Sequence, residues 1–379
     1  MTSALPPIPI PAHLLPADGR FGSGPSKVRQ AQADAVARAG SSLLGTSHRQ
    51  DPVRDLVGSV RSRLTDLFTL PDGWEILLGN GGTTVLWDAA SFGLIERRSQ
   101  HLSFGEFSSK FAAVTAAAPH LDDPSVISAD PGSAPDGGLA DPDIDAYCLT
   151  HNETSTGVAV SLARPDGATS DQLVLVDATS AAGGIPWDPA EVDVYYFAPQ
   201  KCFAGDGGLW LAACSPEAVD RIGRLCQRGD RWIPASIDLG IALDNSLKNQ
   251  TYNTPALATL ILLDEQLGWM LDGGGLEFAS GRSRQSAEIL YRWAEKSPIA
   301  TPFVTEPALR SPLVGTIDLD DSIDAIAVSG VLRANGVVDT ESYRKLGRNQ
   351  LRIAMYPAVD PADIEALTAC IDHVVGQIS

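Results

Sequence analysis

The sequence has few of the residues that stabilise small secreted proteins or bind structural metals. Its 379 residues contain five cysteines, an odd number, spread along the chain without a CxxC pair. None of the six histidines is followed by another at the i, i+4 spacing. This pattern favours neither a disulfide framework nor a zinc site. We therefore expect reduced thiols, no metal and a cytoplasmic location.

Positive charge and long apolar runs are also scarce. The chain has 28 Lys and Arg against 47 Asp and Glu, a formal net charge of -19. Nucleic-acid binding needs a surplus of basic side chains to neutralise phosphates, so we expect no nucleic-acid partner. No apolar run is long enough to span a bilayer, so we expect no membrane segment. The hydrophobic fraction of 44% is sufficient for a sizeable core in two to three domains.

The first twenty residues differ from the rest in their proline content. Because proline lacks an amide N–H and fixes φ, this density excludes a helix and favours an extended arm over residues 1–20. The segment has no basic start followed by an apolar stretch, so it is not a secretory signal. Its prolines are Pro6, Pro7, Pro9, Pro11 and Pro16.

Beyond the arm, apolar strands and helices alternate. A helix is predicted from Asp51 to Phe68, with Pro52 at its first turn. Continuous apolar runs are typical of strands that are covered on both faces. The order predicts an α/β fold with a mostly parallel sheet flanked by helices. The predicted strands are residues 75–79, 146–149, 173–176, 194–197 and 209–212.

A second, smaller unit is predicted after a long apolar helix capped by Thr254 and Pro255, which runs to about Leu271. We place the large domain at residues 21–265 and a small α+β domain at residues 266–379. The small domain's predicted elements are helices near 283–293 and 323–332, strands near 314–319 and 351–355, and a last helix capped by Asp360 and Pro361.

Candidate site residues follow the predicted strands, where ligands of open α/β sheets gather. Residues 79–84, Gly-Asn-Gly-Gly-Thr-Thr, precede a helix and could cradle a phosphate, although a plain tight turn has the same composition. The segment has neither the lysine of a P-loop nor the third glycine of a dinucleotide fingerprint. Asp177 ends an apolar strand, and a carboxylate there needs a cation or strong hydrogen bonds unless it merely caps a turn.

Lys201 lies among small, aromatic and apolar residues, so loss of water would lower its pKa and free the amine for chemistry. Taken in order, a phosphate cradle, a strand-terminal Asp177 and a later lysine match the requirements of pyridoxal phosphate. Phe107 is the candidate for stacking on its ring. Basic residues suited to binding carboxylate or phosphate lie at His48 and Arg49 and again at residues 344–352.

The sequence resembles the phosphoserine aminotransferases, in particular their actinobacterial branch, within the class V, fold type I aminotransferases. The resemblance covers nearly the whole chain beyond the proline arm. Many relatives have Trp where this chain has Phe107, which preserves stacking and loses an N–H donor. The segments that carry the resemblance are residues 21–25, 45–49, 79–83, 151–154, 176–180, 197–201 and 252–255.

The resemblance implies a homodimer with shared active sites and pyridoxal 5'-phosphate as cofactor. Lys201 would form the Schiff base and move the proton, and Asp177 would pair with the ring nitrogen. The substrate's α-carboxylate would bind Arg352, and its phosphate would bind the partner's His48 and Arg49, with Arg344 and Lys345 nearby. The remaining implied cofactor contacts are Gly82, Thr83, Phe107, Thr154, Thr179 and Gln200, with Asn253 and Thr254 from the partner.

The implied reaction is transamination of 3-phosphohydroxypyruvate by L-glutamate, with phosphohydroxythreonine as a further substrate in pyridoxine synthesis. A serine–pyruvate or alanine–glyoxylate aminotransferase would keep Asp177 and Lys201 without needing His48 and Arg49. A non-catalytic small-molecule binding protein on the same scaffold would not need Lys201. A cysteine desulfurase would need a mobile loop with a reactive cysteine, and Cys226 and Cys370 do not lie in such a loop.

Overall fold

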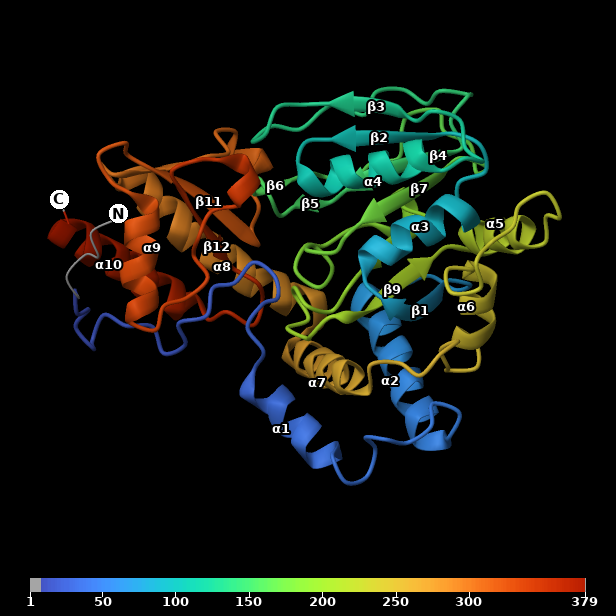
Figure 1. Ribbon diagram of the computed structural model, residues 1–379, viewed down its shortest axis with the longest axis horizontal. Coiled ribbons are helices and arrows are strands. Elements are labelled where there is room, and N and C mark those ends of the chain that lie inside the picture. The colour runs from blue at the N-terminus through green and yellow to red at the C-terminus, as the bar shows by residue number, and fades with distance from the viewer. Residues whose placement is uncertain (1–7, 379) are drawn as a thin grey trace.

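A seven-stranded sheet forms the centre of the larger part of the molecule, in a computed structural model that describes residues 8–378 (Figure 1). Only β9 runs opposite to its neighbours, so the sheet is mostly parallel, as predicted. In spatial order the strands are β1 (Glu75–Gly81), β9 (Gly208–Cys214), β8 (Val194–Phe197), β7 (Leu173–Asp177), β4 (Ala146–Thr150), β2 (Ser99–Ser103) and β3 (Ser125–Ser128).

Helices cover both faces of this sheet. Along β7, Val174 and Val176 pack into the core that contains α2 (Asp51–Phe68) and α7 (Leu257–Gly273). The alternate residues of β7 pack into a second core on the other face. Burial on both faces explains why these strands are continuous apolar runs rather than alternating ones. The second core is covered by α3 (Thr83–Gly93), α4 (Glu106–Ala117), α5 (Pro216–Cys226) and α6 (Leu239–Ser246), while α1 (Gln30–Ala39) packs on α7.

A smaller antiparallel sheet and three helices form a separate core beside the large sheet (Figure 1). The predicted strands, the helix near 323–332 and the last helix of this part are confirmed within a few residues. The prediction of domain boundaries at residues 20 and 265 stays a prediction. The elements are α8 (Gly275–Lys296), β10 (Ala300–Pro302), β11 (Val314–Leu319), α9 (Ala325–Ala334), β12 (Gln350–Ala354) and α10 (Pro361–Ile378).

The described part of the proline-rich arm packs on this smaller core through Ile8, Ile10, Leu14 and Leu15. No helix forms between residues 8 and 20. Pro6 and Pro7 lie outside the described residues. Within residues 8–378, no helix combines the length and apolar character that crossing a bilayer requires.

Two predictions about elements were wrong. Thr254 and Pro255 do not cap α7, which begins at Leu257; the Thr254 carbonyl instead accepts a hydrogen bond from the Asn80 side chain at 3.1 Å. The helix predicted at 283–293 begins earlier, at Gly275. Only Gly274 separates it from the end of α7, because glycine can adopt the φ of 120° that turns the chain between the two helices. Strands β2 and β3 were not predicted. Residues 99–103 of β2 are mostly polar, and β3 has only four residues.

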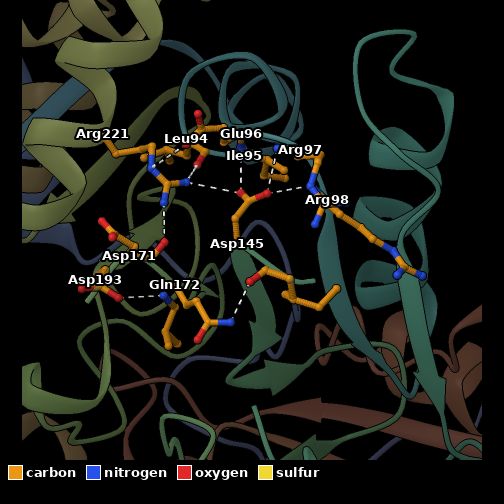
Figure 2. Close-up of polar contacts among 12 residues, drawn as sticks. Leu94, Ile95, Glu96, Arg97, Arg98, Asp145, Asp171, Gln172, Asp193 and Arg221 are labelled. Atoms are coloured by element: carbon orange, nitrogen blue, oxygen red, sulfur yellow. Dashed lines mark hydrogen bonds and ion pairs between the residues drawn. The ribbon is translucent and has the colours of Figure 1, made fainter. Parts of the chain in front are cut away.

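A buried arginine joins the amino ends of the parallel strands, opposite the edge predicted to hold the site (Figure 2). Arg221 of α5 is 1% exposed and donates to the carbonyls of Leu94 at 2.9 Å and Asp171 at 2.5 Å, and to Asp145 Oδ1 at 3.3 Å. A buried charge needs such partners to offset its lost hydration. The Asp145 carboxylate also accepts three backbone N–H bonds of 2.7 Å, from Glu96, Arg97 and Arg98.

Candidate active site

A cavity of about 410 Å³ lies at the carboxyl edge of the sheet. Residues from the ends of β4, β7 and β8 and from the start of α3 and α4 line it, because parallel strands end at one edge. Seven of the predicted site residues are brought together there: Thr83, Phe107, Thr154, Asp177, Thr179, Gln200 and Lys201.

Asp177, the last residue of β7, is 5% exposed and has only neutral hydrogen-bond donors. Its Oδ1 accepts from the Thr179 amide at 2.9 Å and from the Thr179 hydroxyl at 2.6 Å. Its Oδ2 accepts from the Trp87 indole N–H at 3.1 Å. Burial raises the pKa of the Asp177 carboxyl, and these hydrogen bonds oppose the rise. A buried carboxylate that faces a cavity and forms no ion pair with a described residue suits a positively charged ligand atom.

Lys201 follows β8 and extends its amine into the same cavity. Burial lowers the pKa of this amine to about 8, and the positive charge of Arg352 contributes to the lowering. The amine donates to the Ser23 carbonyl, which also accepts from the Tyr356 hydroxyl at 2.9 Å. A lysine with a lowered pKa has a larger neutral fraction near pH 7, as nucleophilic and proton-transfer roles require.

Gly24 has no side chain and so makes room for the amine of Lys201, a role that the sequence alone did not reveal. A Cβ atom at Gly24 would lie 1.8 Å from Lys201 Nζ. The adjoining Ser26 holds the lysine's backbone, since its hydroxyl donates to the Lys201 carbonyl at 2.6 Å and its amide donates to the Gln200 carbonyl at 2.9 Å.

The glycine-rich turn between β1 and α3 forms one end of the cavity. Gly82 is the residue before the first turn of α3, and Thr83 begins that helix and lines the cavity. Gln200 also lines the cavity, and its buried Oε1 atom has no hydrogen-bond partner. A helix N-terminus with a hydroxyl is a suitable place for an anion such as phosphate.

Thr154 and Phe107 line the cavity from two other segments. The Thr154 hydroxyl donates to the Ser180 hydroxyl at 2.8 Å, and the Asn152 side-chain amide does the same at 2.8 Å. The Asn152 Oδ1 atom has no partner. Trp87, Asn152 and Ser180 were not predicted as site residues, because their contacts join segments far apart in the sequence.

Arg352 lies next to this cavity on β12 of the smaller sheet. Its Nη1 donates to the Thr154 carbonyl at 3.4 Å, and its guanidinium carbon lies 5.2 Å from the centre of the Tyr343 ring. Its buried Nε atom has no partner, and burial lowers its pKa. Arg344 and Lys345 are exposed, and Lys345 forms an ion pair with Glu106 at the start of α4.

The structure does not bring the remaining predicted residues into this cavity within one chain. His48 and Thr254 lie together elsewhere on the chain, with His48 Nδ1 3.3 Å from the Thr254 hydroxyl. Arg49 and Asn253 are exposed beside them in sequence. Burial lowers the pKa of His48, and the charge of Arg49 adds to this effect.

Comparison with known proteins identifies the family to which this chain belongs. The family model described as aminotransferase class-V matches residues 136–367. The phosphoserine aminotransferase of a Nocardioides species is 63% identical over 379 residues, covering 100% of both chains. That of Rhodococcus jostii is 60% identical over 369 residues, covering 97% of this chain and 98% of its own. The chain belongs to the phosphoserine aminotransferase family of class V.

Solved structures share the fold of this class V member. A phosphoserine aminotransferase from Cytophaga hutchinsonii aligns with a TM-score of 0.86 at 22% identity, over 94% of this chain and 99% of that one. A pyridoxal-phosphate-bound phosphoserine aminotransferase from Trichomonas vaginalis aligns with a TM-score of 0.78 at 18% identity, over 94% and 99% of the two chains.

The cavity of this family member fits pyridoxal phosphate, the cofactor of class V aminotransferases. Among the described residues, the buried Asp177 carboxylate accepts hydrogen bonds from neutral donors alone, and Thr83 at the start of α3 lines the same cavity. A protonated ring nitrogen would supply the positive charge that Asp177 lacks, and a phosphate would accept from the backbone N–H groups and the hydroxyl at the start of α3.

Proposed function

We propose that this protein transfers the amino group of L-glutamate to 3-phosphohydroxypyruvate, giving O-phospho-L-serine and 2-oxoglutarate. The observation that carries the proposal is the shared cavity of Asp177 and the lowered-pKa amine of Lys201 in a chain 63% identical to a phosphoserine aminotransferase. Bound pyridoxal phosphate supplies an electron sink for the negative charge that develops at the substrate α-carbon.

The side chains of this chain supply binding and proton transfer. Asp177 holds the proton on the ring nitrogen, and its hydrogen bonds from Thr179 and Trp87 keep the carboxylate oriented. Lys201 binds the cofactor and then takes and returns the proton at the substrate α-carbon. Its pKa of about 8 lies nearer to neutral pH than that of an ordinary lysine, which favours proton transfer in both directions.

Further residues hold the cofactor's outer groups. Gly82, Thr83 and Gln200 would bind the phosphate. The Thr154 hydroxyl, which here donates to Ser180, would turn to donate to the phenolic oxygen. Phe107 would stack on the ring. The proposal rests on the place of Thr83, Gln200, Thr154 and Phe107 around the cavity and on the position of Gly82 directly before α3.

Arg352 would bind the substrate α-carboxylate. It has a buried Nε without a partner, and a guanidinium donates to a carboxylate in a bidentate manner. Arg344 and Lys345 would add positive charge at the opening, since both are exposed next to Tyr343, whose ring centre lies 6.3 Å from that of Phe107.

We infer that the working form is a homodimer in which His48, Arg49, Asn253 and Thr254 complete the partner's site. His48 contacts Thr254, so the chain presents both donor segments on one surface. Exposed apolar side chains of Leu44 and Tyr252 flank them, 38% and 48% exposed. Apolar side chains beside groups that lack a ligand in their own chain suit a subunit interface.

The charge of Arg49 and the adjoining imidazole of His48 distinguish this function from that of a serine–pyruvate or alanine–glyoxylate aminotransferase. The test is an assay of phosphoserine with 2-oxoglutarate against a panel of unphosphorylated amino donors, for wild type and Arg49→Ala. We expect phosphoserine to be preferred and the substitution to lower kcat/KM about 100-fold for phosphoserine, with little loss for alanine. An equal loss for both donors would contradict the phosphate-binding role.

We also propose that the enzyme acts in the cytoplasm and accepts the phosphohydroxythreonine of pyridoxine synthesis. All five cysteines are free, as in reducing compartments. The second substrate would present the same phosphate and α-carboxylate to the same basic residues. Activity with phosphohydroxythreonine in the same assay, lost in Arg49→Ala, is the expected result.

A further inference from the structure

Glu153 is a fully buried carboxylate that forms no ion pair with any residue between 8 and 378, and both of its oxygens accept hydrogen bonds. It is 0% exposed. Its Oε2 accepts from the amides of Phe107 at 3.1 Å and Ser108 at 3.0 Å, and from the Ser108 hydroxyl at 3.0 Å. Its Oε1 accepts from the Ser155 amide at 3.2 Å and the Ser155 hydroxyl at 2.7 Å. Both carboxylate oxygens are therefore satisfied by neutral donors.

These bonds hold the first turn of α4. The Ser155 hydroxyl also accepts from the Glu106 amide at 3.0 Å, so the first three amides of the helix all end on Glu153 and Ser155. A negative charge at a helix N-terminus is favourable, because it meets unpaired N–H groups and the positive end of the helix dipole. Further along, α4 is held by Phe111, which is 3% exposed in the core. The first turn depends on Glu153.

Side chains of the segment 152–155 contact two different parts of the molecule. Asn152 and Thr154 bond to Ser180 at the cavity, whereas Glu153 and Ser155 bond to the helix. Asn152–Glu153 is the strand β5, paired with β6 (Val158–Ala159), and Thr154 and Ser155 begin the turn that joins these two strands.

Gly105 allows the close approach between this segment and the helix. A Cβ atom there would lie 2.3 Å from Glu153 Cγ and 2.7 Å from Ser155 Oγ. The contact between the segment bearing Thr154 and the helix start bearing Phe107 is thus direct and closely packed.

We propose that Glu153, with Ser155, is a positioning residue that fixes the Phe107 ring at a set distance from Thr154 and so shapes the slot that receives the cofactor's ring. The proposal rests on the proposed function only in taking pyridoxal phosphate as the ligand of this cavity. Glu153 itself does not line the cavity and acts through the two residues that do.

The test is a double-mutant cycle of Glu153→Gln and Phe107→Ala, read by titrating the apoprotein with pyridoxal phosphate. Glutamine keeps the size but turns an NH₂ group toward the donors of Ser155 or α4. We expect each single substitution to raise the cofactor Kd about tenfold and the double variant to stay near tenfold, since Phe107 no longer needs positioning once removed. A merely structural role would give independent losses that multiply to about 100-fold.

Two further variants keep the test decisive. Ser155→Ala removes only the hydroxyl link and should raise the Kd in the same direction, again without adding to Phe107→Ala. Asp238→Asn is the matched control, because Asp238 caps α6 by accepting from the amides of Gly240 at 2.8 Å and Ile241 at 3.2 Å, away from the cavity. It should lower the unfolding temperature of the apoprotein and leave the Kd unchanged.

The outcomes separate the two proposals. An unchanged Kd in Glu153→Gln or, if that variant does not fold, in Ser155→Ala overturns the positioning role. Multiplying losses in the cycle overturn it as well. A wild-type apoprotein that does not bind pyridoxal phosphate overturns the proposed function together with it.

Discussion

Replacing Gly24 with alanine tests directly whether the amine of Lys201 must lie where the structure places it. The new Cβ would be 1.8 Å from Lys201 Nζ and 2.7 Å from its Cε. Ordinary contacts between such atoms are about 3.5–4.0 Å, so the amine has to move by roughly 2 Å. The obstructing atoms are the end of a flexible side chain, so the lysine moves and the fold survives.

The expected loss is large for activity and moderate for stability. A displacement of about 1 Å at a reacting group can cost about 100-fold. We therefore expect kcat/KM to fall at least about 100-fold, equivalent to ~2.7 kcal/mol in the activation free energy. Gly24 has φ 151°, and an alanine in such a conformation costs about 1–3 kcal/mol of folding free energy.

The assay is kcat/KM with phosphoserine and 2-oxoglutarate, paired with thermal unfolding of each variant. Gly223→Ala in α5 is the matched control, because a Cβ there meets nothing within 4 Å and its φ is not positive. We expect the control to stay within about twofold of wild type. Gly24→Ala retaining activity within about twofold would refute the reasoning about Lys201.

Three further predictions concern pH, stability and subunit assembly. The rate at which the apoprotein binds pyridoxal phosphate should rise with pH and reach half its maximum near pH 8. The reason is that only the neutral amine of Lys201 reacts, and its pKa is about 8. A midpoint near the ordinary lysine pKa of 10.5 in a stopped-flow series would contradict this prediction. Arg221→Met should lower the free energy of unfolding in urea by about 3 kcal/mol, because it leaves the Asp145 carboxylate without its buried cation, and a loss below about 1 kcal/mol would contradict it. Lys201→Ala and Arg49→Ala chains that are mixed and refolded should recover about one quarter of wild-type activity with phosphoserine. Half of the dimers are hybrids, and each hybrid has one complete site, with Lys201 from one chain and Arg49 from the other. No recovery would exclude shared sites.

The strands of the large sheet were predictable where both faces are buried, as in β7 and β8, because a short, continuous apolar run is typical of a strand covered on both sides. β2 was not, because its residues are polar and buried. His101 is 1% exposed, and its Nε2 lies 2.9 Å from the hydroxyls of both Ser99 and Thr115. Hydrogen bonds between its own polar side chains and with α4 make such a strand possible, and the apolar pattern of the sequence does not reveal them.

The same distinction applies to the site. Asp177, Lys201 and Thr83 follow strands or begin a helix, so their position along the chain indicated a common edge. Gly24 and Glu153 act through tertiary contacts, with Lys201 and with the start of α4 respectively. Their importance depends on three-dimensional packing rather than on spacing in the sequence.

Chemical fixation of the cofactor is the most direct test of the central claim, that Lys201 is the amine that holds pyridoxal phosphate in a cavity shared with Asp177. The loaded protein is reduced with borohydride, digested and mapped by mass spectrometry. The account predicts one phosphopyridoxyl group, on the peptide that contains Lys201, and none in Lys201→Ala. A label on another lysine, or no label in wild type, would contradict it.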